Sequence, residues 1–220
     1  MGTTVTTVGV LGGTGPAGRG VAIRLASAGY DVILGSRDET RAGVTASTLL
    51  ARGEGVIRGG TNQAAADCEF VVVATPWDSA VTTVRELRDS LKGKVVISMV
   101  NALAREGKEL VPLYPARGSM AAQIAFTLPE STIVGAFHHL PASEMEDLDS
   151  GLDADVVIFS DSVAGRAAVV EIVNKMPGLR GVEAGSMSLA SATEAFTAVC
   201  ITINIRHKVH SYVKLAGLPD

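Results

Sequence analysis

The sequence predicts an α/β protein built on a doubly wound parallel sheet. Short apolar runs rich in β-branched residues alternate with helical stretches that end at glycines. Nearly unbroken apolar runs are typical of strands buried on both faces, and short links favour parallel strands with helices on both sides. The strands expected in the first half are residues 5–11, 31–34, 70–75 and 94–100.

The helices expected between these strands have recognisable ends. Gly29, Gly53 and Gly93 follow three helical stretches, and glycine is common just past a helix C-terminus. Asp38 is of the residue type that caps a helix N-terminus. The expected helices are residues 17–28, 38–52 and 79–91.

The second half predicts a smaller α/β segment that ends in a long helix. After a helix at 119–128 and a strand at 132–137, the pattern restarts beyond Gly151. The elements expected there are a strand at 155–160, a helix at 162–176, a strand at 179–184 and a helix at 188–215. We therefore predict a dinucleotide-binding domain over residues 1–150 and a small C-terminal domain over residues 151–220.

Composition excludes several classes of function. The 220 residues carry a formal net charge of −4, with both signs scattered, which disfavours a nucleic-acid partner or an anionic membrane. Cys68 and Cys200 lie far apart, which argues against a zinc site and a disulfide framework. No apolar run approaches the roughly 18 to 20 residues of a membrane span. A cytoplasmic protein is expected.

A glycine motif follows directly on the first expected strand. Gly13, Gly15 and Gly18 satisfy GxGxxG, with Thr14 and Pro16 between them. At a junction of strand and helix these glycines permit a tight turn, a close approach of the backbone to a pyrophosphate, and close packing of the helix. The helix N-terminus supplies amides for the phosphates. The sequence thus predicts a Rossmann-type dinucleotide site.

The end of the second strand indicates which dinucleotide is bound. NAD enzymes commonly carry an acidic residue there, whereas this chain has Ser36 and Arg37, followed by Arg41. A hydroxyl beside a fork-shaped cation suits a 2′-phosphate, so NADP is predicted. The alternative is that both arginines are solvated, although the helix dipole disfavours cations at a helix start.

Thr75, Pro76 and Trp77 lie where the expected strand 70–75 ends, at the sheet edge where ligands bind in open α/β folds. Thr75 and Pro76 are expected beside the nicotinamide, with Pro76 ending the strand. Trp77 is the single tryptophan and is assigned to the same site. Its alternative role is ordinary packing at the rim or in the core.

Together these motifs resemble those of the F420-dependent NADP oxidoreductases, which move a hydride between NADP and the deazaflavin coenzyme F420. The likeness rests on LGGTGPAGRG, LGSR, TPW, AFHHLPA and PGLRGVEAG, at residues 11–20, 34–37, 75–77, 136–142 and 177–185. It covers nearly the whole chain. The combination of the GSR and HHLPA segments is more specific than the glycine motif.

The resemblance implies a homodimer in which NADP lies over the glycine loop and the deazaflavin lies against the loop after residue 137. The residues it assigns to the deazaflavin site are His138, His139, Leu140, Pro141 and Ala142. The segment Val100-Asn101-Ala102 departs from the family pattern, and no role is assigned to it.

No obligatory catalytic residue is predicted, because hydride transfer requires aligned ring carbons rather than a nucleophile or a metal. His138 and His139 are the candidates for orienting the deazaflavin or exchanging a ring-nitrogen proton; alternatively they satisfy backbone groups at a strand end. Arg206, His210 and Lys214 are expected on one face of the last helix, either binding the anionic tail of F420 or simply solvated.

Two other functions remain open at this point. The same scaffold serves NADPH-dependent reductases of flavins, ferric ion or imines. A Rossmann domain without catalysis would be an NADP-binding redox sensor.

Overall fold

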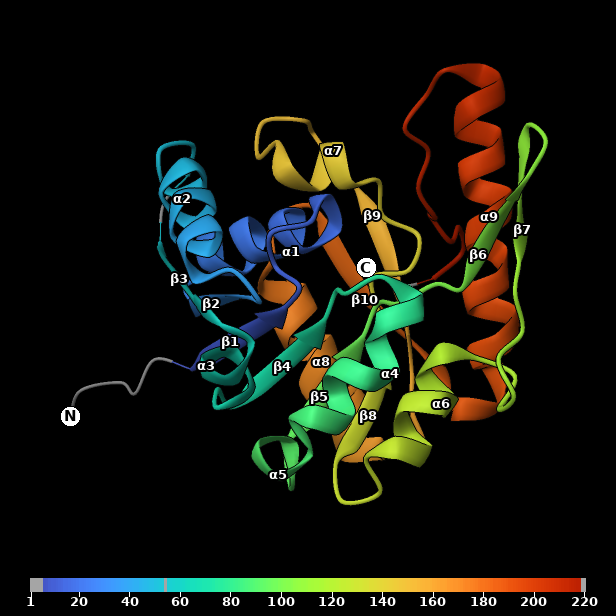
Figure 1. Cartoon of the computed structure of the whole chain (residues 1–220). Coiled ribbons are helices and arrows are strands. Elements are labelled where there is room, and N and C mark those ends of the chain that lie inside the picture. The colour runs from blue at the N-terminus through green and yellow to red at the C-terminus, as the bar shows by residue number, and fades with distance from the viewer. Residues whose placement is uncertain (1–5, 54, 219–220) are drawn as a thin grey trace.

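The computed structural model describes residues 6–53 and 55–218, and its centre is one eight-stranded sheet in the order β10-β9-β8-β5-β4-β1-β2-β3 (Figure 1). Its strands are β1 (Thr7–Leu11), β2 (Asp31–Ser36), β3 (Val56–Thr61), β4 (Phe70–Val73), β5 (Val95–Ser98), β8 (Thr132–Gly135), β9 (Ala154–Phe159) and β10 (Leu179–Gly185). Neighbouring strands are parallel except β8 and β9. The order β3-β2-β1-β4-β5-β8 is that of a Rossmann sheet, so the predicted fold class is confirmed.

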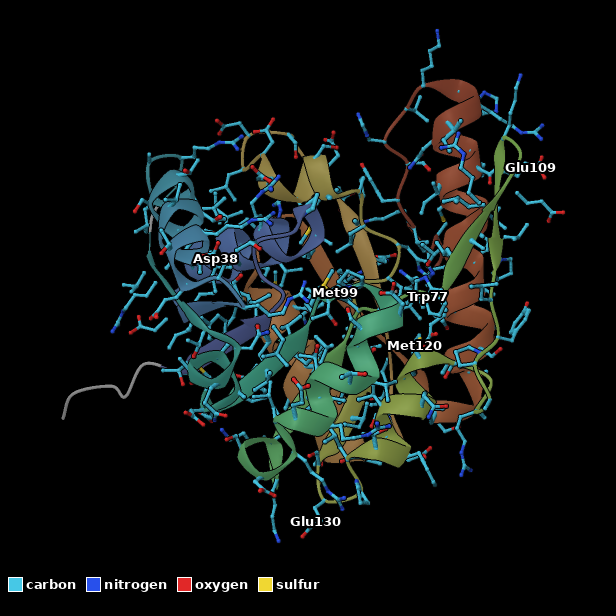
Figure 2. All side chains as sticks on the ribbon, viewed as in Figure 1. Asp38, Trp77, Met99, Glu109, Met120 and Glu130 are labelled. Atoms are coloured by element: carbon cyan, nitrogen blue, oxygen red, sulfur yellow. The ribbon has the colours of Figure 1, made fainter. Side chains whose placement is uncertain are left out.

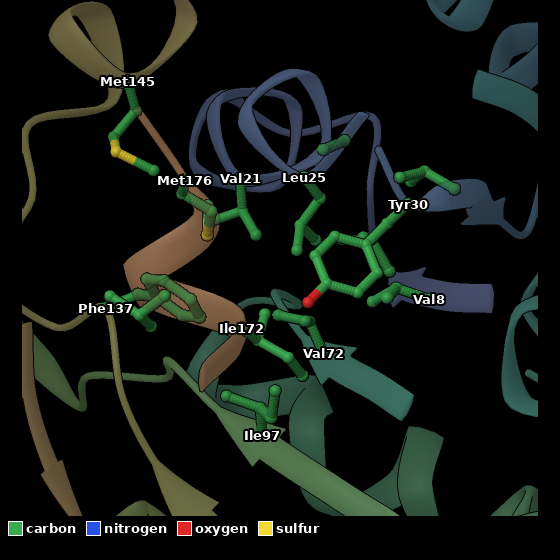
Figure 3. Packing of buried hydrophobic residues seen from close by; sticks show 14 of the residues in the cluster. Val8, Val21, Leu25, Tyr30, Val72, Ile97, Phe137, Met145, Ile172 and Met176 are labelled. Atoms are coloured by element: carbon green, nitrogen blue, oxygen red, sulfur yellow. The ribbon is translucent and has the colours of Figure 1, made fainter. Parts of the chain in front are cut away.

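Helices cover both faces of the sheet. Buried side chains of α1, α2 and α8 join one core cluster, and those of α3, α4 and α6 join another on the opposite face. Figure 3 shows the first cluster, where Val21 and Leu25 of α1 and Ile172 of α8 meet Val72 and Ile97 of the sheet. The helices are α1 (Pro16–Ser27), α2 (Glu39–Leu50), α3 (Asn62–Ala66), α4 (Trp77–Glu86), α5 (Arg88–Leu91), α6 (Met120–Thr127), α7 (Ala142–Glu146), α8 (Val163–Lys175) and α9 (Ala190–His207).

Most elements lie where they were expected, and the differences have local causes. Asp38 caps α2, as predicted, by accepting from the backbone N–H of Arg41 at 3.0 Å. The expected helix 79–91 is divided at Leu87 into α4 and α5. Five elements were not predicted: β3, the short helices α3 and α7, and the hairpin of β6 (Leu103–Glu106) and β7 (Glu109–Pro112). Val5, the expected first residue of β1, lies outside the described residues.

The expected helix 188–215 is confirmed as far as His207 and is wrong beyond it. A 3₁₀ turn (Met187–Leu189) leads into α9, which ends where Lys208 takes a left-handed conformation with φ 55°. Beyond that point Asn204 Oδ1 accepts from the backbone N–H of Ser211 at 2.7 Å and from its hydroxyl at 2.6 Å. The chain therefore turns back, and Leu215 N–H donates to Asp155 of β9 at 2.6 Å.

The last helix also corrects an expectation about membranes. By length and composition alone, the stretch Met187–His207 would suffice to cross a bilayer: an 18-residue window within it has a mean hydropathy of 1.3, and 28% of that window is buried inside the protein. The helix packs on β7 along one side (Figure 1). Several of its apolar side chains are exposed.

Candidate functional site

The loop from β1 into α1 turns sharply at Gly12. Gly12 has φ +70°, and Gly13 N–H donates to the carbonyl of Gly35 at 3.0 Å. A β-carbon on Gly13 would lie 2.5 Å from Leu34 Cδ2 and 2.9 Å from the carbonyl oxygen of Val10. The turn expected at Gly13 is therefore made by Gly12, and Gly13 is needed for packing against β1 and β2.

The other two glycines of the motif differ in what surrounds them. A β-carbon on Gly18 would come within 2.8 Å of Gly13 Cα, so a larger residue would push α1 away from the loop. A β-carbon on Gly15 would meet nothing closer than the Gly12 carbonyl oxygen at 3.6 Å. Pro16 opens α1 without a side-chain cap, so the first amides of the helix are free to bind an anion beside Gly15.

A cavity of about 440 Å³ extends from this loop along the carboxyl ends of β1, β2 and β4. Eight predicted residues line it: Thr14, Gly15, Pro16, Ser36, Arg37, Arg41, Thr75 and Pro76. Trp77 does not; it begins α4 and is 40% exposed (Figure 2). Thr75 Oγ1 is buried and has no partner among the described residues, so this hydroxyl is available to a ligand.

The far end of this cavity carries unpaired positive charge. Ser36 Oγ accepts from Asp38 N–H at 3.1 Å, which holds the turn after β2. Arg37 and Arg41 are exposed there, and no ion pair involves either guanidinium within the described part of the chain. The fork geometry of two free guanidinium groups suits a phosphate.

Several residues that line this cavity were not predicted from the sequence. Asn62 opens α3, and its Oδ1 accepts from Gly12 N–H at 3.3 Å, so it steadies the left-handed turn. The signal was present, since Asn62 directly follows a strand, but the two glycines of β3 concealed that strand. The further lining residues not predicted are Gly12, Ala17, Ala74, Ser79 and Thr83.

A second cavity, of about 270 Å³, lies where the chain leaves β5 and β8 and meets α9. The five residues of the HHLPA segment all line it, namely His138, His139, Leu140, Pro141 and Ala142. Ala17 lines both cavities, so the two adjoin at the first turn of α1. Residues from other elements, among them Asn101 and Thr197, complete the lining and were not predicted.

Phe137 directs the chain into this cavity. It has φ +66°, which is unusual for a bulky residue, and its ring is buried in the core (Figure 3). The conformation reverses the backbone after β8, so His138 and His139 leave the sheet toward α9. Strain of this kind is typical of functional sites.

Both histidines are buried and hydrogen-bonded. His138 Nδ1 lies 3.0 Å from Asn101 Oδ1, and burial, aided by the neighbouring His139, lowers the pKa of His138 to about 3. His139 Nε2 lies 2.7 Å from the carbonyl oxygen of Thr193. Burial also lowers the pKa of His139, although this hydrogen bond acts in the opposite direction. Both rings are therefore neutral near pH 7.

The HHLPA segment is anchored to the dinucleotide helix. Gly20 of α1 faces α7 so closely that a β-carbon there would lie 2.6 Å from Met145 Cβ. The buried guanidinium of Arg24 donates to the carbonyl oxygens of Glu144, Met145 and Asp147 at 2.7, 3.0 and 2.9 Å. These contacts fix α7 on α1, so the walls of the two cavities keep a fixed position relative to each other.

The predicted strip of cations on the last helix does not form. Only Arg206 lies on α9, where it pairs with Glu109 of the hairpin; His210 and Lys214 follow the helix end. Lys214 pairs with Asp153, and His210 Nδ1 lies 3.2 Å from Ser143 Oγ. The helical spacing fails because the chain turns at Lys208.

Comparison with known proteins agrees with this arrangement. Residues 7–102 match a family model described as NADP oxidoreductase, coenzyme F420-dependent. The F420-dependent NADP reductase of Methanocaldococcus jannaschii is 32% identical over 209 residues, covering 91% of this chain and 93% of that protein. The enzyme of the same name from Methanothermobacter thermautotrophicus is 31% identical over 97% of this chain and 96% of its own length.

A solved structure from Arthrobacter sp. FB24, assigned as an F420-dependent NADP reductase, superposes with a TM-score of 0.79 and 25% identity. The match covers 93% of this chain and 96% of the other. Sequence and structure thus agree over nearly the full length. The chain belongs to the family of F420-dependent NADP reductases.

Proposed function

We propose that this protein is an oxidoreductase that transfers a hydride between NADP(H) and coenzyme F420. The observation that carries the proposal is the pair of adjoining cavities at the carboxyl edge of the sheet. One has a glycine loop and free arginines, and the other is walled by the HHLPA segment. A bound deazaflavin supplies a ring carbon that accepts or gives up two electrons as a hydride.

The residues of the first cavity would bind and orient NADP. The amides that open α1 face the position of the pyrophosphate, and Gly15 leaves room for it. Ser36, Arg37 and Arg41 would bind the 2′-phosphate. The unpaired Thr75 hydroxyl is positioned to hydrogen-bond the nicotinamide end, where Pro76 forms the wall.

The residues of the second cavity would hold the deazaflavin ring against that end. His138 and His139 act here as orienting groups, because neutral buried rings are poor proton donors near pH 7. Alignment of two rings is the main source of rate enhancement for such a transfer. Trp77, which lies outside the first cavity, is assigned no contact with the cofactor.

We further propose a functional division at about residue 150, although β9 and β10 belong to the same sheet as the first half. Residues 1–150 would bind NADP, and residues 151–220 would close the deazaflavin cavity through α9. The side chains of Thr197 and Cys200, which line that cavity, support this division.

We also propose a cytoplasmic homodimer with no membrane or nucleic-acid partner, in which a second copy of the chain covers the outer face of α9. A cavity of about 660 Å³ lies there between α9 and β7, away from the cofactor cavities, and its lining includes Phe196, Val199 and Ile203. Arg206 and Glu109 at its rim already pair with each other, so the exposed side chains of Phe196, Val199 and Ile203 are what a second copy would cover. Sedimentation should give a dimer that Val199→Glu dissociates; a monomeric wild type would contradict the assignment.

The function is tested by mixing the purified protein with NADPH and F420, FMN, FAD, ferric citrate or a cyclic imine in separate reactions. Absorbance should report rapid turnover with F420 and at most slow turnover with the others. Preferential turnover of a different acceptor would indicate another reductase. Tight NADPH binding without any turnover would indicate a redox sensor.

A further inference from the structure

Asn101 follows β5 and lines the second cavity. Its side chain joins three separate parts of the second cavity. Asn101 Nδ2 donates to the carbonyl oxygen of His138 at 3.3 Å, and Asn101 Oδ1 lies 3.0 Å from His138 Nδ1. The Thr197 hydroxyl of α9 donates to the same Oδ1 at 3.1 Å and also lies 3.2 Å from the His138 carbonyl oxygen.

These contacts determine where the proton of the His138 ring resides. A carbonyl oxygen only accepts, so the amide –NH₂ of Asn101 must face the His138 carbonyl, and Oδ1 must face the ring. An amide oxygen carries no proton, so Nδ1 of His138 must donate to it. In a neutral imidazole the other nitrogen, Nε2, then offers a lone pair.

That lone pair has no partner in the part of the chain that the structure describes. His138 Nε2 is buried without a hydrogen bond, while His138 itself lines the cavity and is 4% exposed. Its ring stacks on Phe159 with 5.5 Å between centroids, so it is held in place. A buried acceptor without a donor is unfavourable and is normally satisfied by a ligand or water.

The ionisable groups around the ring do not oppose this state. His139 is tilted against it at 6.3 Å between centroids and, like burial, disfavours a charge on His138. On α9, Glu194 and Cys200 lie one turn before and after Thr197. The Glu194 carboxyl accepts from two backbone amides of α6 and has a pKa raised to about 7 by burial, and burial also raises the pKa of the Cys200 thiol.

We infer that Asn101 is a positioning residue that holds His138 with Nδ1 protonated and Nε2 as an acceptor, so that the second cavity recognises a ring N–H of the deazaflavin. This inference rests on the proposed function for the identity of the ligand. The state of the His138 ring in the free protein does not depend on it.

The first arm of the test therefore uses the protein without any coenzyme. ¹⁵N NMR of labelled protein should show one neutral histidine with a protonated Nδ1 whose signals disappear in His138→Gln. Asn101→Leu should shift this ring toward a mixture of tautomers. Asn204→Leu is the matched control, because Asn204 lines the same cavity but bonds Ser211, and the His138 signals should stay unchanged. A wild-type ring protonated at Nε2 would overturn the inference.

The second arm measures kinetics with F420 and NADPH. Asn101→Leu should raise KM for F420 about tenfold and change KM for NADPH by less than twofold. Thr197→Val should produce a smaller rise, which Thr197→Ser should reverse. Asn101→Asp keeps the acceptor but adds a negative charge, which should raise the pKa of His138. The His138 ring should then gain a proton as the pH is lowered, and kcat/KM should acquire a pH dependence between pH 5 and 8. An unchanged KM for F420 in Asn101→Leu, or superimposable pH profiles of wild type and Asn101→Asp, would contradict the inference.

Discussion

Glu194 of α9 accepts a hydrogen bond from the backbone N–H of Met120 at 2.7 Å, and so ties the helix that closes the second cavity to the first turn of α6. Its other oxygen accepts from Ala121 N–H at 2.9 Å. Burial raises the pKa of this carboxyl to about 7 even though both amides favour its charged form.

This pKa predicts how stability changes with pH. The folded protein holds a proton on Glu194 up to about pH 7, whereas the unfolded chain releases it near pH 4.5. The contribution of Glu194 to stability is therefore complete below pH 4.5 and is lost as pH rises to 7, by about 3 kcal/mol. Denaturant unfolding of wild type and Glu194→Gln at several pH values should show their free-energy difference changing across this window. A constant difference would be incompatible with the raised pKa.

Gly15 and Gly13 should respond in opposite ways to the same substitution. Gly15→Val places its side chain in the open space assigned to the pyrophosphate, so NADP binding should be lost with little change in Tm. Gly13→Val is the matched variant, and its contact with Leu34 and the Val10 carbonyl should lower Tm markedly. Calorimetric titration and thermal melts decide between them. Wild-type NADP affinity in Gly15→Val would show that the pyrophosphate does not bind beside Gly15.

Ser36 and Arg37 should set the choice between NADP and NAD. Replacing Ser36 with Asp and Arg37 with Gln removes two of the three residues proposed to bind the phosphate, installs an acceptor for a ribose hydroxyl, and keeps an oxygen near Asp38 N–H. The expected loss of NADP affinity is about 1.5 to 3 kcal/mol, as for a charge-assisted hydrogen bond. Steady-state kinetics with both cofactors measures it, with Arg88→Gln on α5 as control. Equal changes for NADP and NAD would count against this assignment.

His138 and His139 should each have a modest effect on turnover. Burial lowers the pKa of His138 to about 3 and also lowers the pKa of His139, so neither ring should impose a pKa near 6.5 on kcat/KM. Replacing either with Ala should lower kcat by roughly 10- to 100-fold and weaken F420 binding, whereas His207→Ala should do neither. A loss of four decades in kcat with unchanged binding would instead require an obligatory proton donor.

The dinucleotide half of the fold was predictable because each signal was local. Asp38 before a helical stretch predicts a helix start, and the structure has it as the N-cap of α2. Glycines after a buried strand predict a tight turn, and the structure has that turn directly after β1. β3 was missed because Gly59 and Gly60 interrupt its apolar pattern. The left-handed turn was assigned to Gly13 rather than Gly12, since adjacent glycines are equally permissive and only the tertiary contacts of Gly13 with Leu34 separate them.

The second cavity was only partly predictable, since long-range contacts assemble it. The HHLPA segment was assigned to the deazaflavin site because it resembles the corresponding segment of the family. Nothing near Asn101 in the sequence, however, indicates that its amide contacts His138 and Thr197. The end of α9 was misplaced for the same reason. Lys208 ends the helix in a conformation that a lysine rarely adopts, and Asn204 stabilises it through Ser211.

Direct transfer of a hydride between the two cavities is the central claim, and a single-turnover reaction with NADPH deuterated at nicotinamide C4 tests it. With enzyme in excess over F420 in ordinary water, mass spectrometry of the reduced coenzyme should find one deuterium from one of the two C4 stereoisomers and none from the other. Reduced F420 that contains no deuterium with either isomer, or F420 that is not reduced at all, would contradict the account.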